Sequence, residues 1–294
     1  MNLIVGKNFL LDRTVMRKVL SYEISEIVPY INWLYFFHAW GLSGKSNDEK
    51  AKIKKEALDY LGSWNGKYHT HAIFRLLDAN GDGDDICVYP EEVGLTDESA
   101  GLMRIPMLRQ QKVLAEGTPH LCLSDFLRPL SQGVRDKLGI FCCSVDGEIV
   151  TQYRTDDYQS MMAQTLCDRL AEATAERMHE EVRRRYWGYA PDEQLTIEQN
   201  HREEYQGIRP AVGYPSMPDA SLNFILDGLL EMKDIGIRLT ESGMMAPHAS
   251  VSGLMFAHPK AHYFEVGKIG EDQLKDYARR RGIPIEMMRR FVLR

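Results

Sequence analysis

Several features that mark common protein classes are missing from this 294-residue chain. No apolar stretch reaches the roughly 20 residues that a membrane-spanning helix needs. The first residues are too interrupted by polar side chains for a secretory signal peptide, and no small-residue cleavage site follows them. Five cysteines form no C-x-x-C pair and no zinc-ligand spacing. We therefore expect reduced thiols, no bound metal, no membrane partner and a cytoplasmic location.

Concentrated positive charge is also missing. The net charge is −6, and no basic block is longer than short runs such as Arg183-Arg184-Arg185. A nucleic-acid-binding surface needs a basic patch or stripe, so we expect no nucleic-acid partner. The arginine run falls at a predicted helix C-terminus, where cations oppose the helix dipole, and we interpret it as a solvated helix end.

Familiar ligand motifs are absent or incomplete. There is no G-x-G-x-x-G phosphate loop, so the usual nucleotide-binding fold is not indicated. The segment from Asp78 to Asp84 resembles the start of an EF-hand loop, but its twelfth position is Tyr89 instead of a bidentate Glu. An acidic hairpin turn is the better interpretation. His69 and His71 alternate along the chain, yet no third ligand stands at a motif spacing.

Hydrophobic periodicity and turn residues indicate an interspersed set of helices and strands. We expect helices at 7–28, after the capping-box pair Ser46 and Glu49, at 156–186, at 271–281 and after Pro284. We expect a hairpin at 70–90, a strand at 139–143 and paired strands at 251–256 and 263–269. The regular βαβ rhythm of a doubly wound sheet is missing, so an α+β single domain spanning 1–294 is predicted.

The most informative stretch is Arg209-Pro-Ala-Val-Gly-Tyr-Pro215. Arg209 is suited to bind a carboxylate through its planar guanidinium. Gly213 permits a positive φ or a close approach of the backbone to a ligand, and Tyr214 adds a flat amphipathic ring. The combination suits an amino-acid-like ligand with a flat appendage. A Pro/Gly-rich turn with a surface arginine is the alternative.

Two further stretches accompany this segment, at 239–253 and 262–269, and together the three resemble the signature segments of one family. That family is the S-adenosylmethionine-binding activation (reactivation) domain of vitamin B12-dependent methionine synthase. The likeness extends from about Val28 to Phe291. Other matching segments are Tyr30–Trp33, Gly83–Ile86, Leu108–Gln111, Cys122–Phe126, Asp168–Glu172, Tyr186–Pro191, Tyr205–Arg209 and Asp272–Arg279.

The resemblance implies a C-shaped single domain with a twisted antiparallel sheet surrounded by helices and a shallow ligand groove. It also implies a set of S-adenosylmethionine contacts, namely Asn32, Glu172, Arg209, Ala211, Gly213, Tyr214 and Tyr263. Arg209 would hold the methionyl carboxylate, main-chain groups around Ala211 and Gly213 the adenosyl portion, and Tyr214 would face the corrin. Taken alone, Glu172 could be a solvated helix carboxylate and Tyr263 a strand residue packed on the sheet.

One position departs from the family pattern. The family usually has Asp in the Tyr-Ile-x-Trp segment, where this chain has Asn32. An amide cannot make the charge-assisted contact that a carboxylate makes with the ligand's ammonium. Ligand binding is then weaker, or another carboxylate compensates.

The implied function is repair of cobalamin-dependent methionine synthase by reductive methylation of cob(II)alamin to methylcobalamin. S-adenosylmethionine gives the methyl group, a flavodoxin-like donor gives the electron, and no general acid or base is needed. The chain has no Asp-x-His-x-x-Gly motif, so the cobalamin should be carried by a partner module. We expect a component acting in trans, which the start at Met1 favours over a fragment of a longer enzyme. The alternatives are a non-catalytic S-adenosylmethionine-binding regulator and a repair protein for another corrinoid methyltransferase.

Overall fold

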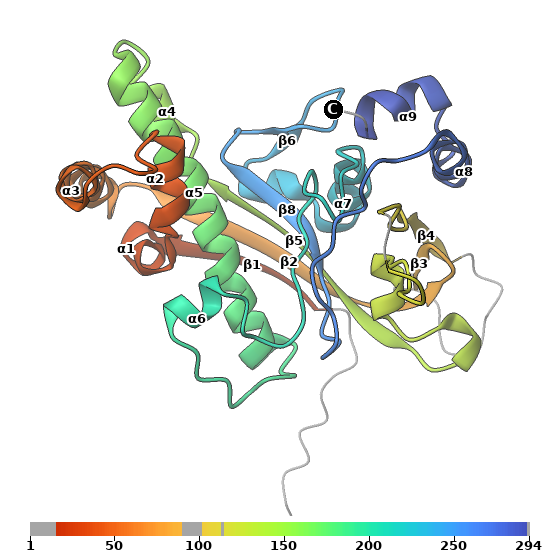
Figure 1. The fold of residues 1–294 in the computed structure, drawn as a ribbon. Coiled ribbons are helices and arrows are strands. Elements are labelled where there is room, and N and C mark those ends of the chain that lie inside the picture. The colour runs from red at the N-terminus through yellow and green to blue at the C-terminus, as the bar shows by residue number, and fades with distance from the viewer. Residues whose placement is uncertain (1–15, 90–101, 113–114, 293–294) are drawn as a thin grey trace, which may run out of the picture.

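A twisted antiparallel sheet forms the centre of the computed structural model, which describes residues 16–89, 102–112 and 115–292 (Figure 1). Its strand order is β4-β3-β2-β5-β8, and β1 pairs with the first half of β2. The strands are β1 (Met16–Glu23), β2 (His69–Asp82), β3 (Asp85–Val88), β4 (Met103–Pro106), β5 (Asp136–Val145) and β8 (Ser250–Met255). The short strands β6 (Arg238–Leu239) and β7 (Met245–Ala246) pair with each other.

Helices cover both faces of the sheet (Figure 1). The α-helices are α1 (Ile24–Ile27), α2 (Trp33–Ala39), α3 (Asn47–Trp64), α4 (Glu148–Thr151), α5 (Asp157–Glu181), α6 (Ile197–His201), α7 (Leu222–Leu230), α8 (Glu271–Arg281) and α9 (Ile285–Val292). Short 3₁₀ turns lie at Val28–Tyr30, Leu123–Phe126, Leu130–Gln132 and Met232–Ile235, and a π-helical turn, Val182–Tyr186, continues α5.

Side-chain alternation along β5 builds one core on each face of the sheet. Phe141 and Cys143 pack with α1, α3 and α5, whereas Ile140 and Cys142 pack with α7, α8 and α9. The neighbouring cysteines therefore lie on opposite faces, and all five cysteines are free and buried. The predicted α+β domain, with an antiparallel sheet surrounded by helices, is confirmed.

Most elements with strong local signals form where they were predicted. Ser46 and Glu49 make the reciprocal bonds of a capping box at the start of α3. Asp156 caps α5 by accepting a hydrogen bond from the Gln159 N–H, 2.9 Å. The predicted hairpin is formed by β2 and β3, and its two-residue turn lies at Gly83-Asp84. No helix of the described ranges is long and apolar enough to cross a membrane.

Two predictions are wrong, and a third is correct only in part. Met16–Glu23 is a strand instead of a helix, because it pairs along the edge of β2. Val19, expected on the buried face of a helix, is 45% exposed in this strand. Residues 7–15 of the predicted helix lie outside the described residues. Residues 263–269 form no strand; they are held by single bonds such as Val266 N–H to Pro215 O, 2.9 Å. The arginine run is a solvated helix end only at the exposed Arg184 and Arg185. Arg183 is fully buried, and its guanidinium donates to Glu193.

Candidate functional site

The arginine–glycine–tyrosine segment lies along the free edge of β8. The Val212 N–H donates to Ser252 O at 2.9 Å, and the Leu254 N–H donates to Pro210 O at 3.0 Å. Gly253 makes this close approach possible, because a Cβ there would lie 2.1 Å from Pro210 O. The segment is therefore fixed to the sheet at a point where any side chain would push it away.

A tight turn follows at Gly213, whose φ of 89° confirms the predicted positive value. The Gly213 N–H donates to Met217 O at 2.8 Å, and the Tyr214 N–H donates to Ala211 O at 3.3 Å. These N–H groups are thus engaged within the chain. The turn would therefore contact a ligand through its carbonyl oxygens, which accept hydrogen bonds from the ligand.

The facing wall of the site is one side of α5. Four charged residues share one face of this helix, because successive members are one, three and four positions apart. They are Asp168, Arg169, Glu172 and Glu176. The opposite side of α5 is apolar and packs on the sheet. A polar helix face and the edge of β8 thus enclose the site between them.

The larger of two neighbouring cavities has a volume of about 460 Å³. It brings together six of the seven residues expected at the site, namely Asn32, Glu172, Arg209, Ala211, Tyr214 and Tyr263. Gly213, the seventh, lines the smaller cavity. Segments from α2, α5 and two loops, far apart in the sequence, therefore converge on one hollow, while the roles of these residues toward a ligand stay predictions.

Arg209 forms the charged floor of the larger cavity. Its side chain is only 6% exposed, so the alternative of a surface arginine is wrong. Nη2 donates to Glu176 Oε1 at 2.5 Å. Burial acts to lower the pKa of Arg209, but Glu176, Tyr205, Tyr263 and Glu172 together outweigh burial, so the pKa is raised. Among the described residues, Arg209 Nε and Glu176 Oε2 are buried without a hydrogen-bond partner.

Tyr263 connects this floor to the loop beyond β8. Its Oη accepts a hydrogen bond from the Arg209 N–H at 2.9 Å, which fixes the backbone where the arginine side chain begins. Burial raises the pKa of the Tyr263 phenol, although the Arg209 charge opposes that shift. Tyr263 thus remains neutral and acts through its hydroxyl; it belongs to a loop, so its interpretation as a strand residue is wrong.

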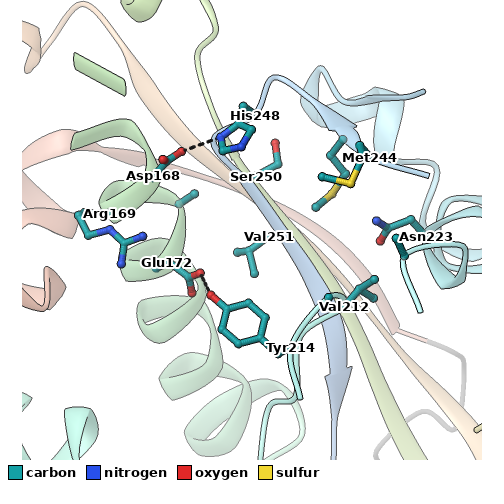
Figure 2. Close-up of a pocket in the computed structure, with 14 residues that line it drawn as sticks. Asp168, Arg169, Glu172, Val212, Tyr214, Asn223, Met244, His248, Ser250 and Val251 are labelled. Atoms are coloured by element: carbon teal, nitrogen blue, oxygen red, sulfur yellow. Dashed lines mark hydrogen bonds and ion pairs between the residues drawn. The ribbon is translucent and has the colours of Figure 1, made fainter. Parts of the chain in front are cut away.

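A smaller cavity of about 270 Å³ adjoins the first (Figure 2). Arg169, Glu172 and Tyr214 line both cavities. The Tyr214 hydroxyl donates to Glu172 Oε1 at 2.6 Å. This bond is one of the dashed lines in Figure 2. Burial and the Glu172 charge both raise the pKa of Tyr214, so this hydroxyl keeps its proton.

Asn32 serves two local purposes. It lines the larger cavity, and its Oδ1 caps α2 by accepting a hydrogen bond from the Leu34 N–H at 3.1 Å. Asn and Asp are both good N-cap residues, so Asn32 starts the helix as an aspartate would, but it places no negative charge in the cavity.

Three lining carboxylates, Glu176, Glu203 and Glu265, were not among the residues expected from the sequence. Glu176 had a usable signal, because it lies one helical turn after Glu172. Glu203 had none, since it sits in a loop with φ at 58° and reaches the cavity only through the path of that loop. Burial and the charge of Glu176 raise the pKa of Glu203.

An antiparallel sheet with helices on both faces defines an α+β domain, and an acidic cavity lies between its edge strand and a long helix. Residues 23–282 match the family model of the vitamin B12 dependent methionine synthase activation domain. The fold is similar to a crystal structure of the MetH reactivation domain bound to AdoHcy, with a TM-score of 0.86 and 37% sequence identity over 96% of this chain and 90% of that one. This chain belongs to the methionine synthase activation-domain family.

Proposed function

We propose that this chain binds S-adenosylmethionine in the larger cavity and presents its methyl group to a cobalamin carried by another module. The observation that carries the proposal is the buried Arg209–Glu176 pair in the floor, with an unpartnered donor and an unpartnered acceptor. AdoHcy, bound in the related structure, is what remains of S-adenosylmethionine once its methyl group has left. A cavity of this shape and charge in the same family therefore suits the methylated form.

Electrostatics support a ligand with net positive charge. The cavity is lined by four glutamates and two arginines, which leaves an acidic surplus. S-adenosylmethionine carries a sulfonium, an ammonium and a carboxylate, and so a net charge of +1 near neutral pH. The Arg209 guanidinium would bind the carboxylate. The carbonyl oxygens of the Gly213 turn would accept from the adenine amino group, and Glu172 would hold polar or cationic parts of the ligand.

The methyl acceptor would be cob(II)alamin on the cobalamin-binding module of methionine synthase. One electron from a flavodoxin-like donor and the methyl group from the sulfonium convert it to methylcobalamin, and the thioether leaves as S-adenosylhomocysteine. The contribution of this chain is to hold the sulfonium at a fixed distance and direction. Tyr214, half-exposed at the boundary of the two cavities, is the group we assign to the acceptor side. The free, buried cysteines support a reducing, cytoplasmic setting.

Asn32 gives some support to a second function, that of a non-catalytic S-adenosylmethionine-binding regulator, because the missing charge weakens one ligand contact. A mixing experiment separates the two. The purified chain, S-adenosylmethionine and a one-electron donor are added to a cob(II)alamin-loaded partner, and the absorption spectrum is followed. Restoration of the methylcobalamin spectrum only when this chain is present supports the repair function. Ligand binding without that spectral change supports the regulator. The same spectral change with another corrinoid methyltransferase would identify that enzyme as the partner.

A further inference from the structure

We infer that Glu176 binds the α-ammonium group of the ligand, so that Glu176 and Arg209 together recognise the free amino-acid end of S-adenosylmethionine. The inference rests on the proposed function and deepens it. No motif in the chain singled out Glu176.

The geometry of the pair carries the argument. Glu176 Oε1 accepts from Arg209 Nη2 at 2.5 Å, while Glu176 Oε2 and Arg209 Nε are buried without a partner in the described part of the chain. Leaving such groups unpaired is costly, and because Glu176 and Arg209 both line the larger cavity, a ligand bound there can supply the two partners. The unpartnered oxygen suits an ammonium, and the unpartnered N–H suits a carboxylate.

The chemistry of the ligand matches this arrangement. An α-amino acid carries its ammonium and carboxylate on one carbon, so their two receptors must be neighbours. Glu176 and Arg209 are neighbours, and both side chains are largely buried, at 21% and 6% exposure. Ligand binding would keep the bond between Glu176 and Arg209. It would add a bond from the ammonium to Glu176 and one from Arg209 to the carboxylate, so that positive and negative charges alternate around the site.

The other carboxylates near the cavity are less suited to this role. Glu172 Oε1 already accepts from the Tyr214 hydroxyl. Arg209, the expected carboxylate receptor, pairs with Glu176 and not with Glu203 among the described residues. Glu265 is largely exposed and pairs with Lys112 at 3.4 Å. Asn32 has no charge, and its side-chain oxygen caps α2. Glu176 is thus the carboxylate that compensates for the aspartate missing at position 32.

The test compares two ligands on two proteins. One ligand is S-adenosylmethionine, and the other is its deamino analogue, S-adenosyl-4-(methylthio)butanoate, which keeps the sulfonium and carboxylate. By calorimetry, Glu176→Gln should weaken S-adenosylmethionine at least about tenfold and the analogue less than about twofold. A general structural role would weaken both ligands equally, and that result, or no change for either, overturns the inference.

Controls separate the possible failures. Glu271→Gln, at the start of α8, removes a carboxylate that pairs with Arg289 and does not line the cavity, so it should leave both affinities unchanged. Failure of the unsubstituted chain to bind S-adenosylmethionine would refute the proposed function itself. Binding without the selective loss in Glu176→Gln would refute this inference alone.

A second variant keeps the test valid if Glu176→Gln does not fold, as judged by circular dichroism. Glu176→Asp retains the charge but withdraws it by one methylene group. The preference for S-adenosylmethionine over the analogue should then fall several-fold. An unchanged preference in this variant would also count against the ammonium contact.

Discussion

The hydroxyl of Tyr214 donates a 2.6 Å hydrogen bond to Glu172, and both residues line the boundary between the two cavities (Figure 2). Glu172 comes from α5 and Tyr214 from the turn beside β8, so this one contact joins the two walls of the site. A ligand in the larger cavity would lie on one side of it and a docked methyl acceptor on the other. The contact therefore offers a way to separate ligand binding from methyl transfer.

Tyr214→Ala should slow restoration of the methylcobalamin spectrum more than it weakens S-adenosylmethionine binding, because the ring lies at the boundary instead of the floor. Stopped-flow absorbance gives the rate, and calorimetry gives the affinity. Tyr158→Ala is the matched control, since Tyr158 is also exposed and donates to a glutamate, Glu56, away from both cavities. Equal losses of rate and affinity in Tyr214→Ala would contradict the assignment.

Arg209→Ala should weaken S-adenosylmethionine by about 1.5–3 kcal/mol, at least tenfold in Kd, because it removes a charged contact in a buried floor. It also leaves Glu176 without its partner, so a stability loss should accompany the affinity loss. Calorimetry checks the first effect and urea unfolding the second. Arg184→Ala, which removes an exposed arginine paired with Glu180, should change neither by more than about 1 kcal/mol. Unchanged affinity in Arg209→Ala would remove Arg209 from the ligand site.

Asn32→Asp should tighten S-adenosylmethionine several-fold by adding a charge-assisted contact with the ammonium. The cap of α2 should survive, since aspartate caps helices as well as asparagine does. Asn32→Ser keeps a capping oxygen without a charge and should not tighten binding. Placed in the Glu176→Gln background, Asn32→Asp should recover much of the lost affinity. Equal or weaker binding of Asn32→Asp would mean that position 32 does not face the ammonium.

His179 should make the protein less stable in mild acid. Burial, reinforced by Arg183 and Arg209, lowers its pKa well below the ordinary 6.5. The unfolded chain then binds a proton that the folded chain does not, so the contribution of His179 to stability is lost as pH falls below about 6.5, at up to about 1.4 kcal/mol per pH unit. Urea unfolding of the natural chain between pH 5 and 8 should show this slope. His179→Gln should reduce it, and an identical slope in both proteins would contradict the prediction.

Local signals were sufficient where the determining contacts lie within a few residues. The capping box of Ser46 and Glu49 and the cap by Asp156 are made inside one helical turn, so sequence spacing predicts them. The buried face of α5 follows in the same way from helical periodicity. The family resemblance predicted the seven expected site residues, because they lie in short sequence segments that are characteristic of the family.

Contacts between distant segments decided the rest. Met16–Glu23 became a strand because β2 offered an unpaired edge, and pairing with that edge outweighs a weak helical pattern. Arg183 is buried because Glu193 and His179 surround its guanidinium after the π-helical turn, which no run of three arginines can indicate. The pairing of Glu176 with Arg209 joins residues 33 positions apart. Only the packing of α5 against the edge of β8 brings those charges together, so the sequence by itself predicted the type of site, and the tertiary structure decided which carboxylate faces the arginine.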